Sequence, residues 1–293
     1  MIFHVITTFP EFIATVFEYG VVRRGVEAGL LTANIVNLRD FTDDKHKSTD
    51  DMPYGGGPGM VMQADPIFRA VESIRAEHGD VPLLYLTPAG EKFSHRIALE
   101  LAGRRKQLAR LDSEHSLGTD LVPASDGEVT DIAAPNTAGD TLPPYVDSVP
   151  QSHWRDGFIL LCGRYEGVDQ RVIDHLVDRE LSVGDYVLSG GELAAMVVVD
   201  AVARLVPGVL GNFESSGSDS FATGLLDWPH YTRPEVFRDW AVPPVLISGD
   251  HGKILRYRQE QALLLTFLRR PELLSDEQKA EVARLLAARQ HQD

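Results

Sequence analysis

The chain has 293 residues, of which 43% are hydrophobic and 24% are charged, and its formal net charge is −15. This length and composition exclude a wholly disordered chain and allow about two domains. A cytoplasmic protein is expected, because no apolar run approaches the ~18 residues of a membrane helix, the N-terminal segment lacks the pattern of a secretion signal, and the single cysteine excludes an internal disulfide.

Short apolar runs rich in β-branched residues alternate with helical patterns along the first 205 residues. The runs predict strands at 2–7, 33–38, 83–87, 158–162 and 180–183. Helices are predicted at 11–17, 66–78, 94–111, 168–177 and 192–205, with Asp65 as the N-cap before Pro66. This alternation predicts an α/β fold with a largely parallel sheet.

Two segments interrupt or end this pattern. Residues 106–156 hold a long acidic stretch without periodicity, which we expect to be a mobile surface insertion. Residues 211–224 are small and polar, which is typical of a flexible linker. Beyond the linker only helices are expected, at 252–269 and 275–290, where Ser275 and Gln278 match a capping box. The predicted organisation is a 1–210 α/β domain, a 211–224 linker and a 225–293 helical domain.

The charge is distributed unevenly along the chain. Residues 112–156 carry nine acidic side chains and one basic side chain, whereas residues 232–270 carry seven basic and four acidic side chains. Because affinity for phosphate comes from lysine and arginine, the acidic total alone disfavours nucleic acid as a partner. The local excess of positive charge at 232–270 is compatible with a basic face on an otherwise acidic protein.

Three glycine-rich turns are candidates for ligand binding, at 54–60, 163–167 and 182–192. None fits the dinucleotide pattern or the phosphate-loop pattern, which disfavours both classes of site. Taken singly, each is best interpreted as an ordinary turn. Two of them follow predicted parallel strands, however, and ligands of α/β sheets collect at the carboxyl ends of strands.

Other residues allow two interpretations when only the sequence is considered. Arg204 and Asp219 are adequately explained as a basic residue at a helix C-terminus and an acid in a polar linker. The segment 228–234 combines aromatic residues with an arginine, which suits either stacking on unpaired RNA bases or a turn bounded by prolines.

Six segments together resemble the TrmD family of bacterial tRNA (guanine-N1)-methyltransferases, within the SPOUT superfamily. The resemblance covers most of the chain and leaves 106–156 as an unusual insertion. The segments are LRDFTDDKHKSTDDMPYGGGPGM (38–60), LLCGRYEGVDQRV (160–172), SVGDYVLSGGELAAM (182–196), PGVLG (207–211), DSFATGLLDWPHYTRPEV (219–236) and LRRPELL (268–274).

This resemblance implies a SPOUT-type parallel sheet with a deep trefoil knot, plus a small helical C-terminal domain. It also implies a homodimer with the active site at the subunit interface, S-adenosylmethionine as cofactor, magnesium during catalysis, and tRNA as substrate. The implied reaction is methylation of N1 of guanine 37, 3′ of the anticodon. A SPOUT RNA 2′-O-methyltransferase and a non-catalytic RNA-binding protein of the same fold are the alternatives.

The resemblance also implies the roles of individual residues. Asp219 matches the family's catalytic aspartate, which would serve as general base, and Arg204 matches its catalytic arginine. No dedicated metal ligands are implied. The implied substrate-binding residues are Asp50, Tyr54, Gly55, Gly57, Gly59, His230 and Arg233. The implied cofactor-binding residues are Leu86, Thr87, Pro88, Gly163, Tyr165, Glu166, Gly167, Val183, Gly184, Asp185, Tyr186, Val187, Leu188, Gly190 and Gly191.

Overall fold

The computed structural model describes residues 1–104, 107–109, 111, 154, 156–210 and 219–290. Nearly all of the expected insertion and the first part of the expected linker therefore lie outside the described residues. The described residues form two compact units, one within 1–105 and 132–213 and the other including 214–293. In the described part of the chain, no helix is long and apolar enough to cross a membrane.

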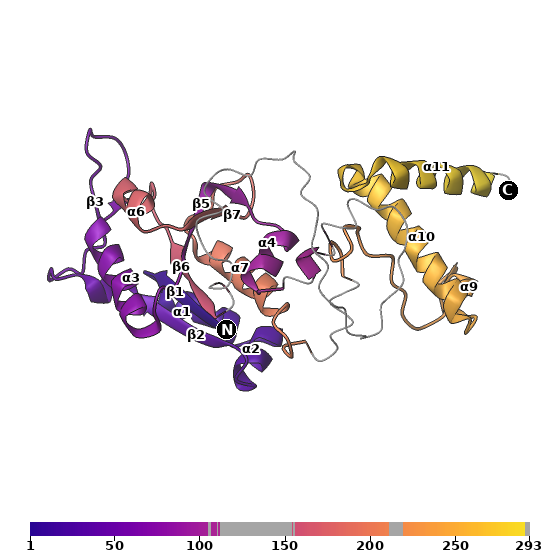
Figure 1. Cartoon of the computed structure of the whole chain (residues 1–293), viewed down its shortest axis with the longest axis horizontal. Coiled ribbons are helices and arrows are strands. Elements are labelled where there is room, and N and C mark those ends of the chain that lie inside the picture. Colours follow the sequence, from indigo (N-terminus) through magenta and orange to yellow (C-terminus); the bar gives the residue numbers. More distant parts are fainter. Residues whose placement is uncertain (105–106, 110, 112–153, 155, 211–218, 291–293) are drawn as a thin grey trace. The chain divides into compact units, whose positions relative to one another are not determined.

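A five-stranded parallel sheet forms the centre of the first unit (Figure 1). The strand order is β2-β1-β6-β5-β7, and every pair is parallel. The strands are β1 (Ile2–Thr7), β2 (Thr32–Asn37), β5 (Leu83–Lys92), β6 (Gly157–Cys162) and β7 (Arg179–Ser182). The five predicted strands and the parallel α/β class are thus confirmed, with ends that shift by a residue or so except in β5, which is longer.

Helices cover both faces of this sheet. Ile6, Tyr85 and Ile159 share one face and pack against α3 (Ala64–His78) and α6 (Gln170–His175). The other face meets α7 (Glu192–Ala203), which also contacts α1 (Pro10–Phe17), α2 (Gly20–Glu27) and α4 (His95–Leu101). A 3-10 turn, η1 (Leu38–Phe41), and a short hairpin of β3 (Asp50–Asp51) and β4 (Val61–Met62) complete the unit.

Three details of the predicted helices need correction. The helix predicted at 94–111 is interrupted, because α4 ends at Leu101 and residues 102–104 are not helical. The prediction that Asp65 caps α3 is wrong, because the helix begins at Ala64 and its N-cap is Gln63. Asp65 instead lies in the first turn, where its carboxylate still complements the positive end of the helix dipole. The helix α2 was not predicted, since Gly20 and Gly25 weaken its helical pattern.

The strand β5 makes an unusual excursion beside β7. Leu181 of β7 is the partner of Leu86 before the excursion and of Glu91 after it. A Cβ atom at Gly90 would lie 2.4 Å from the Leu181 backbone nitrogen, so only glycine fits where the two chains approach. Residues 87–90 are thereby held at the carboxyl ends of the strands.

The second unit has a small helical core. Its helices are α9 (Pro244–Ile247), α10 (His251–Arg269) and α11 (Asp276–Gln290), with a 3-10 turn, η2 (Pro271–Leu273). Leu264 and Val282 are buried between them. The capping box is confirmed, because Ser275 N donates to Gln278 Oε1 and Gln278 N donates to Ser275 Oγ.

The expectation of helices alone beyond the linker is wrong. An antiparallel hairpin of β8 (Val236–Phe237) and β9 (Trp240–Ala241) precedes α9. Two-residue strands are too short to give a periodic pattern, so the sequence carried little signal for them. The described part of the expected linker, 219–224, is a hydrogen-bonded turn in which Phe221 N donates to Leu225 O.

A buried histidine makes the stability of the first unit sensitive to acid. His4 on β1 is only 1% exposed, and its ring lies 4.6 Å from that of His78. Burial, and secondarily the nearby His78, lower the pKa of His4 to about 4. The neutral His4 ring is hydrogen-bonded to the Asn34 side chain, with 2.9 Å between His4 Nδ1 and Asn34 Nδ2.

We predict that the free energy of unfolding falls as the pH drops from about 6.5 to 4. In this range the unfolded chain binds a proton at His4 while the folded chain does not. This difference lowers the free energy of unfolding by up to about 3 kcal/mol. Urea denaturation at pH 7.5, 5.5 and 4.5 measures this loss. His4→Gln should flatten the profile, whereas His251→Gln, a change of an exposed histidine, should not. An unaltered profile for His4→Gln would contradict the prediction.

Candidate functional site

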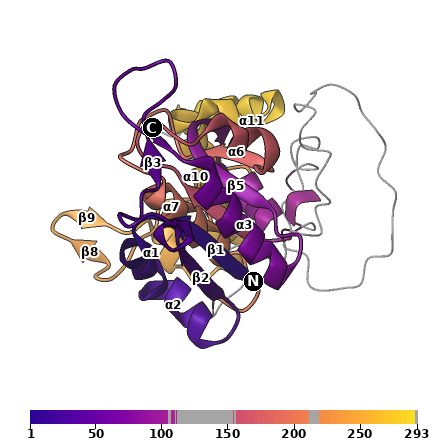
Figure 2. The same cartoon turned by 90° about the vertical axis from the view of Figure 1, so that its left-hand side faces the viewer.

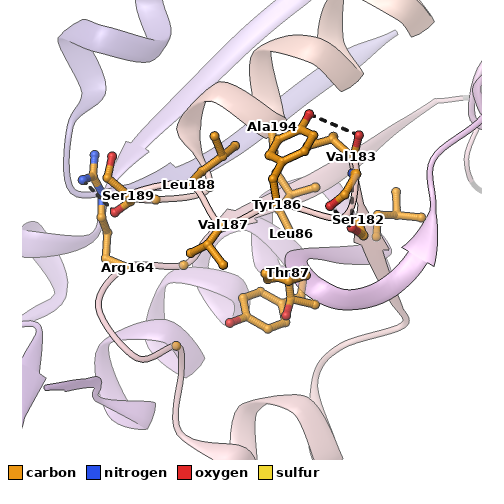
Figure 3. A pocket seen from close by; sticks show the side chains of 18 of the residues that line it. Leu86, Thr87, Arg164, Ser182, Val183, Tyr186, Val187, Leu188, Ser189 and Ala194 are labelled. Carbon is orange, nitrogen blue, oxygen red and sulfur yellow. Dashed lines mark hydrogen bonds between the residues drawn. The ribbon is translucent and has the colours of Figure 1, made fainter. Parts of the chain in front are cut away.

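A pocket of about 260 Å³ lies at the carboxyl ends of β5, β6 and β7 (Figure 3). Its walls come from three chain segments, which are residues 85–88 within β5, residues 163–167 after β6, and residues from the end of β7 to the first turn of α7. Apolar side chains such as Leu86, Leu188 and Ala194 line it together with main-chain groups of glycine-rich turns. The position agrees with the general location of ligand sites in parallel α/β sheets.

All but one of the residues expected to bind a cofactor line the pocket. The exception is Asp185, which is not part of the lining and whose carboxylate lies 3.1 Å from Lys92 Nζ. Six lining residues were not anticipated. They are Tyr85, Arg164, Leu181, Ser182, Ser189 and Ala194.

Glycines let two loops of the pocket touch backbone to backbone. Gly191 N donates a hydrogen bond to Gly163 O at 2.8 Å, and a Cβ at Gly191 would lie 2.8 Å from Cys162 Cα. A Cβ at Gly163 would meet the ring of Tyr85 at 3.0 Å. Glycine is therefore needed at these positions so that the pocket walls can pack against each other. The sequence pattern alone did not indicate this role.

Arg164 joins the two loops through a buried carboxylate. Its Nη2 lies 3.0 Å from Glu192 Oε2, its Nη1 donates to Ser189 O, and its guanidinium lies 4.3 Å from the Phe9 ring centroid. Glu192, 1% exposed, also accepts a hydrogen bond from Thr7 Oγ1. This ion pair connects β1, the loop after β6 and the start of α7. Sequence reasoning missed it because the partners are 28 positions apart.

The β3–β4 hairpin packs against the loop after β6. Met62 N donates to Gly167 O, and a Cβ at Gly59 would collide with the Glu166 side chain. Asp50 on β3 lies near enough to the Tyr165 phenol to influence its ionisation. Partial burial, followed by the charge of Asp50, raises the pKa of Tyr165. The structure thus brings Asp50 and Gly59 to the edge of the pocket.

The remaining first-unit candidates lie outside the pocket lining. Tyr54, Gly55 and Gly57 occupy the tip of the hairpin loop, where Tyr54 is fully exposed. Arg204 is the exposed C-cap residue of α7. By helical spacing it continues an exposed stripe through Leu193, Val197 and Asp200.

Three candidates belong to the second unit. Asp219 begins the turn that leads into this unit, and its carbonyl oxygen accepts a hydrogen bond from Ala222 N. His230 is exposed, and its Nε2 lies 2.8 Å from the Asp227 carboxylate. Arg233 is also exposed.

The described residues offer little for metal or thiol chemistry. Among them, no group of three or more histidine, cysteine, aspartate or glutamate side chains is arranged to hold a metal ion. Cys162 is buried in β6, and burial raises the pKa of its thiol well above the ordinary value. The thiolate form needed for a nucleophile is therefore disfavoured.

Comparison with known proteins gives consistent matches along the chain. A family model described as tRNA (Guanine-1)-methyltransferase TrmD matches residues 1–111 and 147–276. A tRNA (guanine-N(1)-)-methyltransferase of Idiomarina loihiensis is 44% identical over 289 residues, covering 97% of this chain and 94% of that protein. One from Caldanaerobacter subterraneus is 41% identical over 274 residues, covering 94% and 92%. The family model leaves out 112–146, which lies inside the expected insertion.

We predict that Arg164→Ala lowers the free energy of unfolding by about 3 kcal/mol, because it leaves the buried Glu192 carboxylate without its cation. The matched control is Lys92→Ala, which breaks an exposed ion pair with Asp185 and should cost less than about 1 kcal/mol. Urea denaturation measures both. Adding Glu192→Gln to Arg164→Ala should recover part of the loss. Equal losses for the two single variants would contradict a special role for the buried pair.

Proposed function

Because the chain belongs to the tRNA (Guanine-1)-methyltransferase TrmD family, we propose that it methylates N1 of guanine 37, 3′ of the anticodon in tRNA, with S-adenosylmethionine as methyl donor. The observation that carries this proposal is the pocket at the carboxyl ends of β5, β6 and β7. Fourteen of the fifteen residues to which the family resemblance assigns a cofactor contact line it.

The pocket residues fit S-adenosylmethionine in their chemistry. A pocket with apolar side chains and main-chain groups of glycine-rich turns suits an adenosine moiety. Leu86, Leu188 and Ala194 would supply the apolar surface, and the Glu166 carboxylate would favour a cationic ligand. When bound, the cofactor supplies an electrophilic methyl group.

The family resemblance implies a trefoil knot of the SPOUT type, and we propose that it includes the region where β5 passes β7. Residues 87–90 pass the backbone of Leu181 so closely that Gly90 cannot be replaced without displacement. The walls of the pocket would then belong to the segments that form the knot, and the cofactor would be held there.

An exposed apolar surface supports a homodimer. Phe9 and Phe12 at α1 and Leu193 and Val197 on α7 are each between 43% and 49% exposed, and α1 packs beside α7. Exposed apolar patches of this kind are typical of subunit interfaces. Arg204 lies on the same stripe of α7, which would place it at the interface.

Two charged side chains would carry the chemistry. Guanine N1 is a poor nucleophile until its proton leaves, so a carboxylate positioned at N1 is suited to act as general base, and Asp219 would accept that proton. Negative charge then develops towards O6, where the Arg204 guanidinium would stabilise it. The target base must leave the anticodon stack to be reached. The described residues show no metal-binding cluster, and no step is assigned to magnesium.

The activity is tested by methyl transfer to an unmodified tRNA transcript. We predict that the purified chain transfers labelled methyl groups from S-adenosylmethionine to a transcript with guanine at position 37, and not to one with adenine there. Nuclease digestion and mass spectrometry should identify 1-methylguanosine. A 2′-O-methylated product would support the ribose methyltransferase instead, and binding without transfer would support a non-catalytic RNA-binding protein.

We also predict that each active site combines Arg204 of one subunit with Asp219 of the other. Arg204→Ala and Asp219→Ala homodimers should both be nearly inactive, because each site loses one group. A mixed dimer of the two should recover towards half of wild-type activity, because both changes then fall in the same site. The measurement is tRNA methylation by purified heterodimers that carry two different tags. Activity no higher than that of the homodimers would exclude the shared site.

A further inference from the structure

The β8–β9 hairpin exposes two large aromatic side chains. Phe237 is 55% exposed and Trp240 is 66% exposed, although aromatic rings of this size are normally covered in a folded domain. Figure 2 draws the hairpin, labelled at its left, as a two-stranded finger. The ring centroids of Phe237 and Trp240 are 6.3 Å apart, and the two ring planes are inclined by 41°. The hairpin thus presents aromatic surface to its surroundings.

An arginine at the tip of this hairpin lies against both rings. The guanidinium of Arg238 is 5.3 Å from the Phe237 ring centroid and 5.8 Å from that of Trp240. Arg238 occupies the two-residue turn with φ of 57°, a left-handed conformation that glycine or asparagine adopts at lower cost. A local backbone preference therefore does not explain an arginine at this position, which points to its side chain.

The same unit contains a second group of an arginine with aromatic rings. Arg258 on α10 lies 5.3 Å from the Trp228 ring centroid, and that ring is 5.7 Å from His230. The charge of the unit also sets it apart. Residues 219–290 contain ten basic and ten acidic side chains, so the whole net charge of −15 arises from the rest of the chain. A polyanion is repelled least at this unit.

We propose that Phe237, Arg238 and Trp240 form a contact for unpaired nucleotides of the tRNA substrate. The rings would stack on bases, and the guanidinium would contact an adjacent phosphate. This combination is typical of surfaces that bind single-stranded RNA without reading its sequence. We favour RNA over a protein partner because the Arg238 guanidinium lies beside the Phe237 and Trp240 rings at the tip of the hairpin. The inference rests on the proposed function, since it identifies a further contact to the same substrate.

The first test compares variants of the hairpin with a matched apolar variant. Phe237→Leu and Trp240→Leu each remove one aromatic ring, and the control is Leu268→Ala, which truncates another exposed apolar side chain of this unit. With an unmodified tRNA transcript, each hairpin variant should raise the dissociation constant at least about fivefold, as expected for the loss of one stacked base. The control and the affinity for S-adenosylmethionine should not change.

The second test reports on Trp240 directly. A base stacked on the indole should quench the fluorescence of wild type more than that of Trp240→Phe, and heparin, a polyanion without bases, should not reproduce the difference. Unchanged tRNA affinity of the hairpin variants, or equal quenching, would overturn the proposal. So would a change in oligomeric state caused by the variants, because the rings would then contact a second copy of the chain. A wild-type protein without methyl transfer would instead contradict the proposed function.

Discussion

The close contact between the loop after β6 and the loop before α7 is the constraint on which the pocket depends. These loops meet backbone to backbone, with Gly191 N bonded to Gly163 O. Any side chain at Gly191 would push into the Cys162 backbone and separate the two walls. A glycine at this position therefore allows the two walls of the pocket to meet. Direct backbone contact between the walls restricts their relative movement, and restricted walls reduce the entropy that ligand binding must offset.

The buried ion pair of Arg164 and Glu192 strengthens the same contact electrostatically. Burial of a carboxylate is costly, and a well-packed apolar pair would often stabilise a protein equally well. The geometry suggests why the charged pair is useful here. Glu192 lies in the first turn of α7, where the helix dipole favours a negative charge, and it also accepts the Thr7 hydroxyl. One carboxylate thus fixes the relative directions of β1, the loop after β6 and the start of α7, which apolar contacts do less specifically.

How far the sequence predicts this molecule depends on the range of the interactions. The strands of the sheet were predicted because β-branched runs reflect burial on both faces. The capping box at Ser275 was predicted because both partners lie within one helical turn. Arg164 was missed because its partner is distant in the sequence, and the cap of α3 was misplaced by two residues because Gln63 makes no side-chain capping hydrogen bond. The pocket lining came from family resemblance, since periodicity alone could not place three separate loops together.

The charge distribution bears on how an acidic chain can act on tRNA. A net charge of −15 would weaken the approach of a polyanion if it were spread evenly. The balanced charge of residues 219–290 removes that repulsion locally, and aromatic surface can then supply binding energy that does not depend on charge. Stacking is also less sensitive to salt than phosphate contacts, because it releases few counterions. An RNA-binding unit built from arginine and aromatic rings is therefore a physical alternative to a strongly basic patch in a chain whose remaining surface is acidic.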